Sequence, residues 1–159
     1  MSTNSNIAIK LESGKIRSVY CHWDGYVQHN GKILNTYYNS VDKVIELINN
    51  GTISILAPNI GNKHDFDLNQ REVSFEDRVC TFYHRDRNEL WENNKPNEYN
   101  NEYTWLADAA EEYNYLFKDN EWFLVYRNTK NEIVYESLNE YFKELYYENI
   151  EKITEVLSS

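Results

Sequence analysis

The sequence predicts an α+β fold in which an antiparallel sheet of about five to seven strands, including two hairpins, is packed by about two to four helices. Segments with a period of two and segments with a helical period occur in blocks rather than in strict alternation. The 159 residues suit one domain, and 41% of them are hydrophobic and 15% aromatic, which supplies one core. We therefore expect a single α+β domain over residues 1–159.

A hairpin and two helices are predicted first. Apolar side chains alternate over residues 7–22 around a Ser-Gly turn, which is typical of a β-hairpin. The period becomes helical over residues 31–38. A second helix is expected between Ser40, a suitable N-cap, and Gly51, a C-terminal stop.

The middle of the chain is predicted to contain short strands and two loops. Strands are expected around residues 53–58, 73–75 and 78–86, and a loop over residues 59–69 carries a histidine. Residues 87–102 are rich in Asn and Glu and show no periodicity, so we expect a mobile loop there.

The last third is predicted to add a helix, a hairpin, a strand and a closing helix. Thr104 is a suitable cap for a short helix, and residues 113–126 alternate around an Asp-Asn turn. A strand follows at residues 133–135. Ser137 and Glu140 then form a capping box that begins an amphipathic helix. Its apolar face contains Leu138, Phe142, Leu145, Ile153 and Val156.

The composition excludes several classes of partner. Twenty-six acidic against sixteen basic residues give a net charge of −10, which argues against direct nucleic-acid binding because that binding depends on cations. No stretch approaches the roughly 20 apolar residues of a membrane span, so we expect no membrane association. The N-terminus lacks signal-peptide features, and Cys21 and Cys80 are too few for a disulfide framework. These features favour a cytoplasmic protein with free thiols.

Few motifs of known chemistry are present. The sequence contains only five glycines and no Gly-rich phosphate loop, Gly-x-Ser-x-Gly elbow or Cys-His arrangement. We expect no cofactor, no bound metal and no assigned catalytic residue, and these absences disfavour an enzyme.

Two His-x-Asp pairs are candidates for chemistry: His22 with Asp24, and His84 with Asp86. Residues two apart in a strand share a face, so each pair can place an imidazole beside a carboxylate. This combination suits general acid–base work, ligand contact or transition-metal binding. The alternative interpretation is a histidine held by its neighbouring carboxylate for structural reasons.

A second candidate combines residues 20–26, reading Tyr-Cys-His-Trp-Asp-Gly-Tyr, with residues 83–87, which supply two arginines. Guanidinium forks bind phosphate oxygens, and aromatic rings stack on bases. If the two segments adjoin, they form a nucleotide site; the alternative is that the arginines pair with neighbouring carboxylates. The candidate ligand-binding residues are Tyr20, His22, Trp23, Asp24, Tyr26, Tyr83, His84, Arg85, Asp86 and Arg87.

A third candidate is the row of carboxylates on the last helix, where glutamates recur every four residues from Glu136 to Glu148. Such a row can imitate a phosphate backbone. The alternative interpretation is the solvated face opposite the apolar one.

Four motifs resemble a family of short, largely uncharacterised proteins of tailed bacteriophages. They are residues 5–9 (Ser-Asn-Ile-Ala-Ile), residues 20–26, residues 31–34 (Gly-Lys-Ile-Leu) and residues 84–87 (His-Arg-Asp-Arg). The similarity covers about the first 90 residues and, more loosely, residues 115–117. Family members often have Pro where this chain has Val27. The resemblance implies a phage origin, an accessory role and a location in the cytoplasm of an infected bacterial cell.

Three functions are compatible with these features. The first is a counter-defence protein that binds a nucleotide-derived immune signal, of the cyclic oligonucleotide or cyclic ADP-ribose type, and sequesters it without turnover. The second is an acidic inhibitor of a host defence protein, in which the glutamates imitate nucleic acid. The third is a His/Asp phosphodiesterase acting on such signals. A homo-oligomer is an open alternative in each case.

Overall fold

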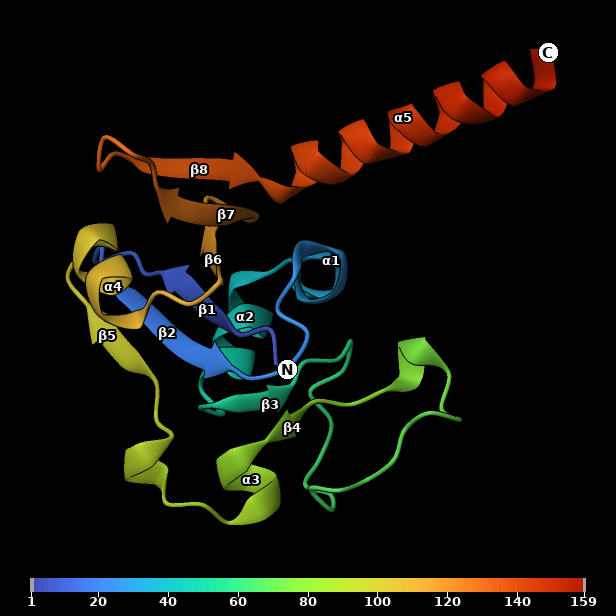
Figure 1. The fold of residues 1–159 in the computed structure, drawn as a ribbon. Helices are drawn as coiled ribbons and strands as arrows, with labels where there is room; N and C mark the ends of the chain where they lie inside the picture. The colour runs from blue at the N-terminus through green and yellow to red at the C-terminus, as the bar shows by residue number, and fades with distance from the viewer. Residues whose placement is uncertain (1, 159) are drawn as a thin grey trace.

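The computed structural model describes residues 2–158 as an α+β fold built on one open, eight-stranded sheet (Figure 1). The strands are β1 (Ser5–Lys10), β2 (Ile16–Cys21), β3 (Ile53–Ile55), β4 (Thr81–Phe82), β5 (Asn97–Tyr99), β6 (Tyr113–Lys118), β7 (Glu121–Arg127) and β8 (Ile133–Ser137). The helices are α1 (Lys32–Tyr37), α2 (Val41–Ile48), α3 (Tyr83–Arg87), α4 (Glu102–Ala109) and α5 (Leu138–Ser158).

The sheet is mixed, so the prediction of an antiparallel sheet is wrong. The strand order is β4-β3-β2-β1-β6-β7-β8, with β5 also paired to β2. The β2–β3 and β1–β6 pairs are parallel, while the remaining pairs are antiparallel. The β2–β3 pair follows from the two helices between these strands, because a helical crossover returns the chain in the same direction. Strands and helices also exceed the predicted numbers by one each.

Both predicted hairpins are confirmed. β1 and β2 pair from Ser5 with Cys21 to Lys10 with Ile16. β6 and β7 are joined by Asp119 and Asn120, which have φ values of 52° and 62°. Two positive φ values give a turn whose twist matches that of the strands, and Asp and Asn tolerate this conformation better than most residues.

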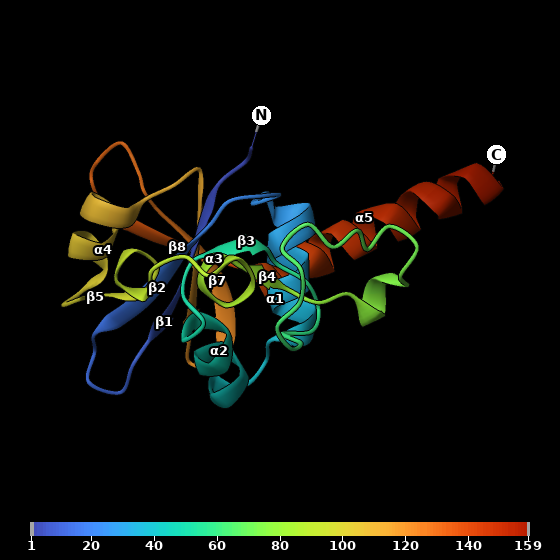
Figure 2. The same cartoon turned by 90° about the horizontal axis from the view of Figure 1, so that it is seen from below.

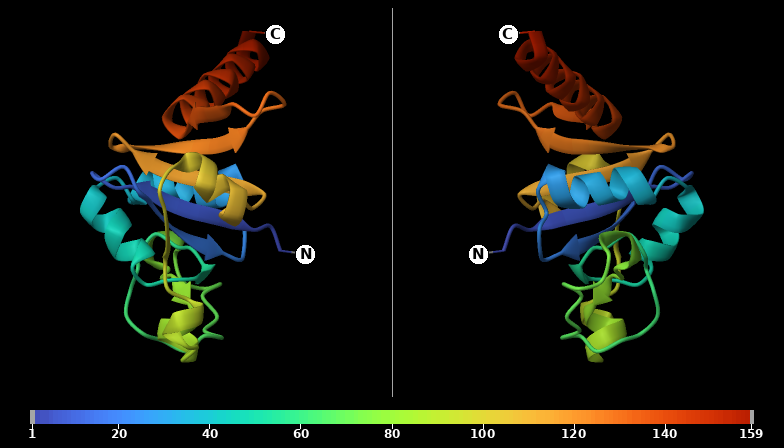
Figure 3. Two further views of the ribbon diagram at one scale, coloured as in Figure 1. Left: turned by 90° about the vertical axis from the view of Figure 1, so that its left-hand side faces the viewer. Right: turned by 90° about the vertical axis from the view of Figure 1, so that its right-hand side faces the viewer.

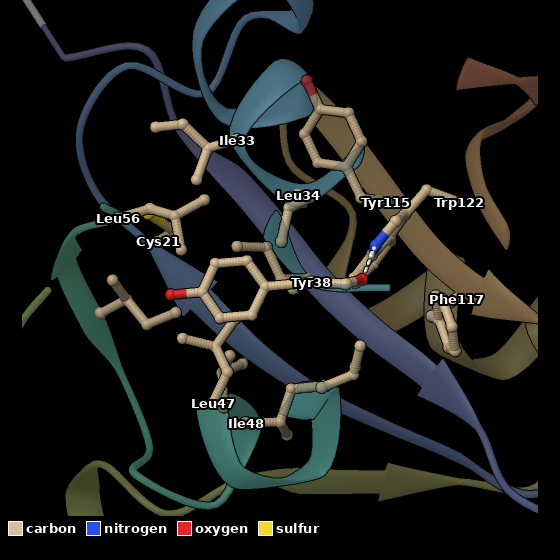
Figure 4. Close-up of a cluster of buried hydrophobic side chains, with 14 of the residues drawn as sticks. Cys21, Ile33, Leu34, Tyr38, Leu47, Ile48, Leu56, Tyr115, Phe117 and Trp122 are labelled. Carbon is tan, nitrogen blue, oxygen red and sulfur yellow. Dashed lines mark hydrogen bonds between the residues drawn. The ribbon is translucent and has the colours of Figure 1, made fainter. Parts of the chain in front are cut away.

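The main core lies between the sheet and helices α1 and α2. Figure 4 shows Tyr38 inside this cluster, with the indole Nε1 of Trp122 donating a hydrogen bond of 2.8 Å to the Tyr38 carbonyl. The opposite face of the sheet carries a smaller core around Trp105 of α4, whose indole N–H donates to Asn6 Oδ1 over 2.8 Å. The sheet is therefore covered on both faces near its centre.

The helix predicted between Ser40 and Gly51 is confirmed. The Ser40 hydroxyl accepts a hydrogen bond from the Lys43 amide, as an N-cap does. Gly51 follows the helix with a φ of 81°. The Ser40 side chain therefore sets the start of the helix, and the backbone freedom of Gly51 sets its end.

The segment between β3 and α4 differs from its prediction. The expected strand at residues 73–75 is replaced by a 3₁₀ turn, Phe75–Asp77. The expected strand at residues 78–86 is reduced to β4, and the chain then turns into helix α3. The polar stretch 87–102 contains a 3₁₀ turn, Trp91–Asn93, and strand β5; its mobility stays a prediction.

Helix α5 extends away from the sheet after its first turns (Figures 1 and 3). The Ser137 hydroxyl accepts a hydrogen bond from the Glu140 amide over 3.2 Å, which confirms Ser137 as the cap of this helix. Within residues 2–158, no helix has the length and apolar character that crossing a membrane requires.

Candidate functional site

The predicted aromatic stretch 20–26 forms the end of β2 and a tight turn. Backbone amides of His22 and Trp23 donate to the carbonyls of Ile53 and Ser54, so the chain stays on β3 beyond the last residue of β2. Asp24 then takes a φ of 56°. At Gly25 a Cβ atom would lie 2.9 Å from the backbone of Asn4, so glycine is required for this close approach.

A short π-helix, η1 (Val27–Gly31), follows the turn and carries the side chain that fixes it. The buried amide Nδ2 of Asn30 donates to Ser5 Oγ over 3.2 Å and to the Trp23 carbonyl over 3.1 Å. Single π-turns inside helices often occur at functional sites. The turn and η1 are thus one rigid unit.

The same asparagine orients His29. Because Asn30 Nδ2 donates elsewhere, Asn30 Oδ1 is the acceptor for His29 Nδ1, at 2.9 Å. Nδ1 then carries the proton, and Nε2 of a neutral His29 is left as an acceptor. This nitrogen belongs to a side chain that lines a cleft.

The cleft lies between the turn, β3 and the loop that precedes β4, and we call it the Trp23 cleft. It measures about 470 Å³ and is lined by Trp23, Asp24, His29, Ile55, Leu56, Ala57, Leu68, Gln70, Arg71, Phe75, Arg78 and Val79. Ligand pockets typically enclose about 300 to 1,000 Å³. Two aromatic side chains of the lining are accessible, since Trp23 is 42% exposed and Phe75 is 43% exposed.

Two arginines supply positive charge to the Trp23 cleft. The Arg71 guanidinium has no hydrogen bond or ion pair with any residue between 2 and 158. Arg78 lies over the Phe75 ring, 5.6 Å from its centroid, and its Nε donates to the Val73 carbonyl over 3.1 Å. The first arginine is free for an anion, and the second is held against an aromatic wall.

The loop that carries these arginines, drawn in green after β3 in Figure 2, is fixed at its base by hydrogen bonds. The Gln70 amide bonds both backbone groups of Val79, donating to the carbonyl over 2.9 Å and accepting from the amide over 2.8 Å. Asn59 donates its side-chain amide to the carbonyls of Glu76 and Arg78. Such a loop, with its ends held together and its chain pinned inside, presents side chains in defined positions.

A second, smaller cavity adjoins the Trp23 cleft. It measures about 320 Å³, lies against α1 and is lined by Gln28, His29, Lys32, Ile33, Thr36, Tyr37 and Phe75. The two cavities share His29 and Phe75. The Phe75 ring and the His29 imidazole, whose centroids are 6.5 Å apart, therefore form a partition between them.

The second predicted segment, residues 83–87, lies elsewhere. Arg85 donates four hydrogen bonds within the chain: to Asp86 Oδ1, to the carbonyls of Ile60 and Gly61, and to the Cys80 carbonyl. Its guanidinium is therefore used to anchor the loop after β3. This side chain is not presented to the Trp23 cleft.

Asp86 is the buried partner of Arg85. Its carboxylate accepts from Arg85 Nε at 3.0 Å and from the backbone amides of Phe82 and His64 at 2.8 and 3.0 Å. Burial alone would raise the pKa of Asp86, but these hydrogen bonds outweigh it and lower the pKa below its ordinary value. The Asp86 carboxylate therefore holds local structure and is not available to a ligand.

The other residues of this segment also have partners within the chain. Arg87 pairs with Glu89 at 3.0 Å and stacks on Phe66. His84 Nδ1 lies 2.7 Å from the Glu89 carbonyl, and its ring meets Trp91 edge-on. A cavity of about 500 Å³ beside them is lined by Lys63, His64, Asp65, Phe66, Asp67, Asp86 and Arg87.

The two predicted segments do not form one site, because β3 lies between them. Cys21, Ile53 and Phe82 align across β2, β3 and β4. Of the first segment, Trp23 and Asp24 line the Trp23 cleft, and Tyr26 stacks beside His29 with a centroid distance of 5.9 Å. Tyr20 and His22 flank a residue of the main core in β2, and the Tyr20 hydroxyl lies 2.8 Å from His22 Nδ1.

Neither His-x-Asp pair places its imidazole beside its carboxylate as predicted. His84 and Asp86 belong to helix α3, where residues two apart point to different sides. His22 and Asp24 are separated by the end of β2 and the positive φ of Asp24. Among residues 2–158, no group of three His, Cys, Asp or Glu side chains is arranged to hold a metal ion.

The sequence reasoning missed the residues that complete the Trp23 cleft: His29, Arg71, Phe75 and Arg78. One local signal was available. Ser74 followed by Glu76 and Asp77 has the composition of a helix start, which favours a turn over a strand at Phe75. The π-helix that orients His29 has no comparable sequence signal.

Comparison of the chain with protein-family models, with curated proteins and with solved structures finds no match.

Proposed function

We propose that the protein binds a small nucleotide-type ligand in the Trp23 cleft and sequesters it without chemical turnover. The observation that supports this proposal is the pairing of exposed aromatic rings with an unpaired guanidinium in one cavity of ligand size. A nucleotide needs both, because its base stacks on rings and its phosphate binds cations. The site retains Trp23 and Asp24 of the predicted set and replaces the arginines of α3 with those of the loop.

The proposed binding mode assigns a role to each wall. A base stacks on Trp23 or Phe75, which contributes about 1 to 3 kcal/mol per base. Arg71 binds a phosphate with its free fork, and Asp24 accepts a hydrogen bond from a ribose hydroxyl. In a chain of net charge −10, two arginines in one cleft are a local exception that favours an anionic ligand.

Sequestration is preferred to hydrolysis because potential nucleophiles and bases are otherwise engaged. Cys21 and Cys80 are buried, and burial raises the pKa of both thiols. The imidazoles of His22, His64 and His84 each lie within hydrogen-bond distance of another group of the chain. His29 differs from these three because its imidazole lines the Trp23 cleft, where Nε2 of its neutral form is an acceptor. Phosphodiester hydrolysis assisted by His29 is therefore the alternative activity at the same site.

The resemblance to tailed-bacteriophage proteins extends this proposal to a biological setting. A small accessory protein that removes a nucleotide-derived signal would suppress bacterial defence during infection. A cyclic oligonucleotide or a cyclic ADP-ribose species has the ring and phosphate groups that the cleft complements.

Isothermal titration calorimetry with a panel of linear and cyclic nucleotides tests the binding proposal. Trp23→Ala and Arg71→Ala should each weaken binding by at least tenfold. Trp91→Ala and Arg87→Ala are matched controls, because they remove an exposed indole and an exposed guanidinium outside the cleft. Absence of heat with every nucleotide, or equal effects of site and control variants, would overturn the proposal.

Mass spectrometry of the same mixtures separates sequestration from hydrolysis. A bound nucleotide recovered unchanged after heat release supports sequestration. A hydrolysed product that disappears with His29→Gln would instead assign phosphodiesterase activity to the cleft.

The acidic inhibitor stays the second candidate, on the observation that α5 extends from the body and carries Glu140, Glu144, Glu148, Glu151 and Glu155. It predicts salt-dependent binding to a basic protein. Reversing the charge of Glu144, Glu148 and Glu151 should abolish that binding and leave nucleotide binding unchanged.

A further inference from the structure

The distal half of α5 carries apolar side chains that no part of the described chain covers. The helix contacts the body through Leu138, which is buried, and through Tyr141, whose hydroxyl accepts a hydrogen bond of 2.8 Å from Gln28. Beyond this point Tyr146 is 62% exposed, Ile153 59% and Leu157 81%. Figures 1, 2 and 3 agree that this part of the helix extends away from the sheet.

These exposed side chains form one narrow stripe. Tyr146, Ile150, Ile153 and Leu157 follow one another at intervals of four, three and four residues. This is the spacing of the contact positions of a two-helix coiled coil. We call these residues the α5 stripe.

Charge is kept away from the α5 stripe. At about 100° per residue, the glutamates at 144, 148, 151 and 155 lie on the opposite side of the helix. The positions flanking the stripe hold Tyr147, Asn149 and Thr154. The α5 stripe of this strongly acidic chain is thus apolar and has uncharged edges. Two identical copies can therefore approach along it without repulsion between like charges.

The stripe has the symmetry that a second copy requires. The intervals four, three and four read the same in both directions, so an antiparallel copy presents the same pattern. A two-fold axis between Ile150 and Ile153 places each of these residues opposite the other in the second helix, and Tyr146 opposite Leu157. A self-complementary patch of this kind is the geometry of a two-fold dimer.

We propose that two copies of this protein associate through their α5 stripes as an antiparallel helix pair. The overlap runs from residue 146 to residue 157 and therefore begins beyond Tyr141, the outermost residue of α5 with a hydrogen bond to the body. The two bodies lie at opposite ends of the pair and leave both Trp23 clefts open.

The association is expected to depend on concentration. Only about two heptads overlap, so the buried area falls below the roughly 1,200 Å² of a standard stable interface. The wild-type protein should be monomeric when dilute and dimeric when concentrated. Sedimentation velocity over a range of concentrations measures this directly.

Charged substitutions in the stripe test its role. Ile150→Glu with Ile153→Glu adds two negative charges at the centre of the seam and should keep the protein monomeric at every concentration. Lys152→Glu is the matched control, because it also changes the charge by −2 but lies outside the stripe. Circular dichroism checks that α5 stays helical; a wild-type protein that is monomeric throughout, or a control that dissociates equally, overturns the proposal.

Cysteine cross-linking tests the orientation independently. Cys21 and Cys80 are buried, so an introduced cysteine is the accessible thiol of the folded protein. A mixture of the Tyr146→Cys and Leu157→Cys variants should form a mixed disulfide dimer in excess of either symmetric one. Symmetric disulfides alone would show a parallel pair, and cosedimentation of a monomer with anionic lipid vesicles would assign the stripe to membrane binding; either result overturns the proposal.

Discussion

The side-chain amide of Asn30 donates a hydrogen bond of 3.1 Å to the backbone carbonyl of Trp23. This contact joins the π-helix to the turn that ends β2, and a second one joins it to Ser5 in β1. One buried amide therefore joins three segments, of which the π-helix and the turn line the Trp23 cleft.

Asn30→Ala should lower the free energy of unfolding by about 1 to 3 kcal/mol, because it leaves buried partners without hydrogen bonds. Urea unfolding measures this. Asn50→Ala is the control, since the Asn50 amide donates to the Glu46 carbonyl at the exposed surface. Equal losses in the two variants would contradict the anchoring role.

Gly51→Ala should destabilise the fold far more than Gly14→Ala. Both glycines have positive φ, 81° and 89°, so each substitution carries a backbone cost of about 1 to 2 kcal/mol. A Cβ at Gly51 would also lie 2.2 Å from the Asn94 carbonyl oxygen, whereas nothing lies within 4 Å of one at Gly14. Because the backbone cost is common to both variants, the difference between their thermal unfolding midpoints measures the effect of the steric clash. Equal midpoints would contradict the predicted clash at Gly51.

Asp86→Asn should change the dependence of stability on pH. The pKa of Asp86 is lower in the folded protein than its unfolded value of about 3.9, so its carboxylate stabilises the fold above that value. The contribution is lost as pH falls through the folded pKa. Wild-type stability should thus fall more steeply than that of the variant as pH decreases below about 4.

At neutral pH the same variant should lose about 3 to 5 kcal/mol, because Arg85 is left without its buried partner. Urea unfolding at several pH values measures both effects. Glu12→Gln, at an exposed position, should match the wild type throughout. If the free energy of unfolding of the variant fell with decreasing pH as steeply as that of the wild type, Asp86 would be excluded as the source of the acid dependence.

Cys21 and Cys80 should not react with thiol reagents in the folded protein. Both are buried, and burial raises the pKa of Cys21 to about 12 and that of Cys80 above its ordinary value. The thiolate, which is the reactive form, is then scarce near pH 8. Ellman's reagent should detect two thiols in urea and none without it; rapid reaction of the native protein would contradict this.

Local patterns predicted the elements whose signals lie within a few residues. The Asp119-Asn120 turn, the Ser40 cap and the Ser137 cap are each confirmed because one or two side chains specify the backbone. The parallel β1–β6 pair was missed because no local pattern records which strand lies beside which. The polar segment before α4 was taken as a loop, although β5 pairs there with β2.

Only a small part of the candidate site was predicted from the sequence. Trp23 and Asp24 line the cleft, since the turn after β2 was apparent from Asp24-Gly25. Arg85 was assigned to a ligand because its strand was expected to continue, but helix α3 turns it toward the Ile60 and Gly61 carbonyls. Arg71 and Phe75 were missed because a long loop brings them to the turn, and loops carry no periodic signal.

The parallel pairing of Ser5 in β1 with Tyr113 in β6 sets the order in which the molecule can be assembled. β1 is synthesised well before β6, so one of its edges has no partner until β6 has followed. Strand pairs so distant in sequence close slowly, and an unpaired edge can join another chain. The nascent protein therefore depends on the β6–β7 hairpin to complete its sheet, and truncation before that hairpin should yield an aggregating fragment.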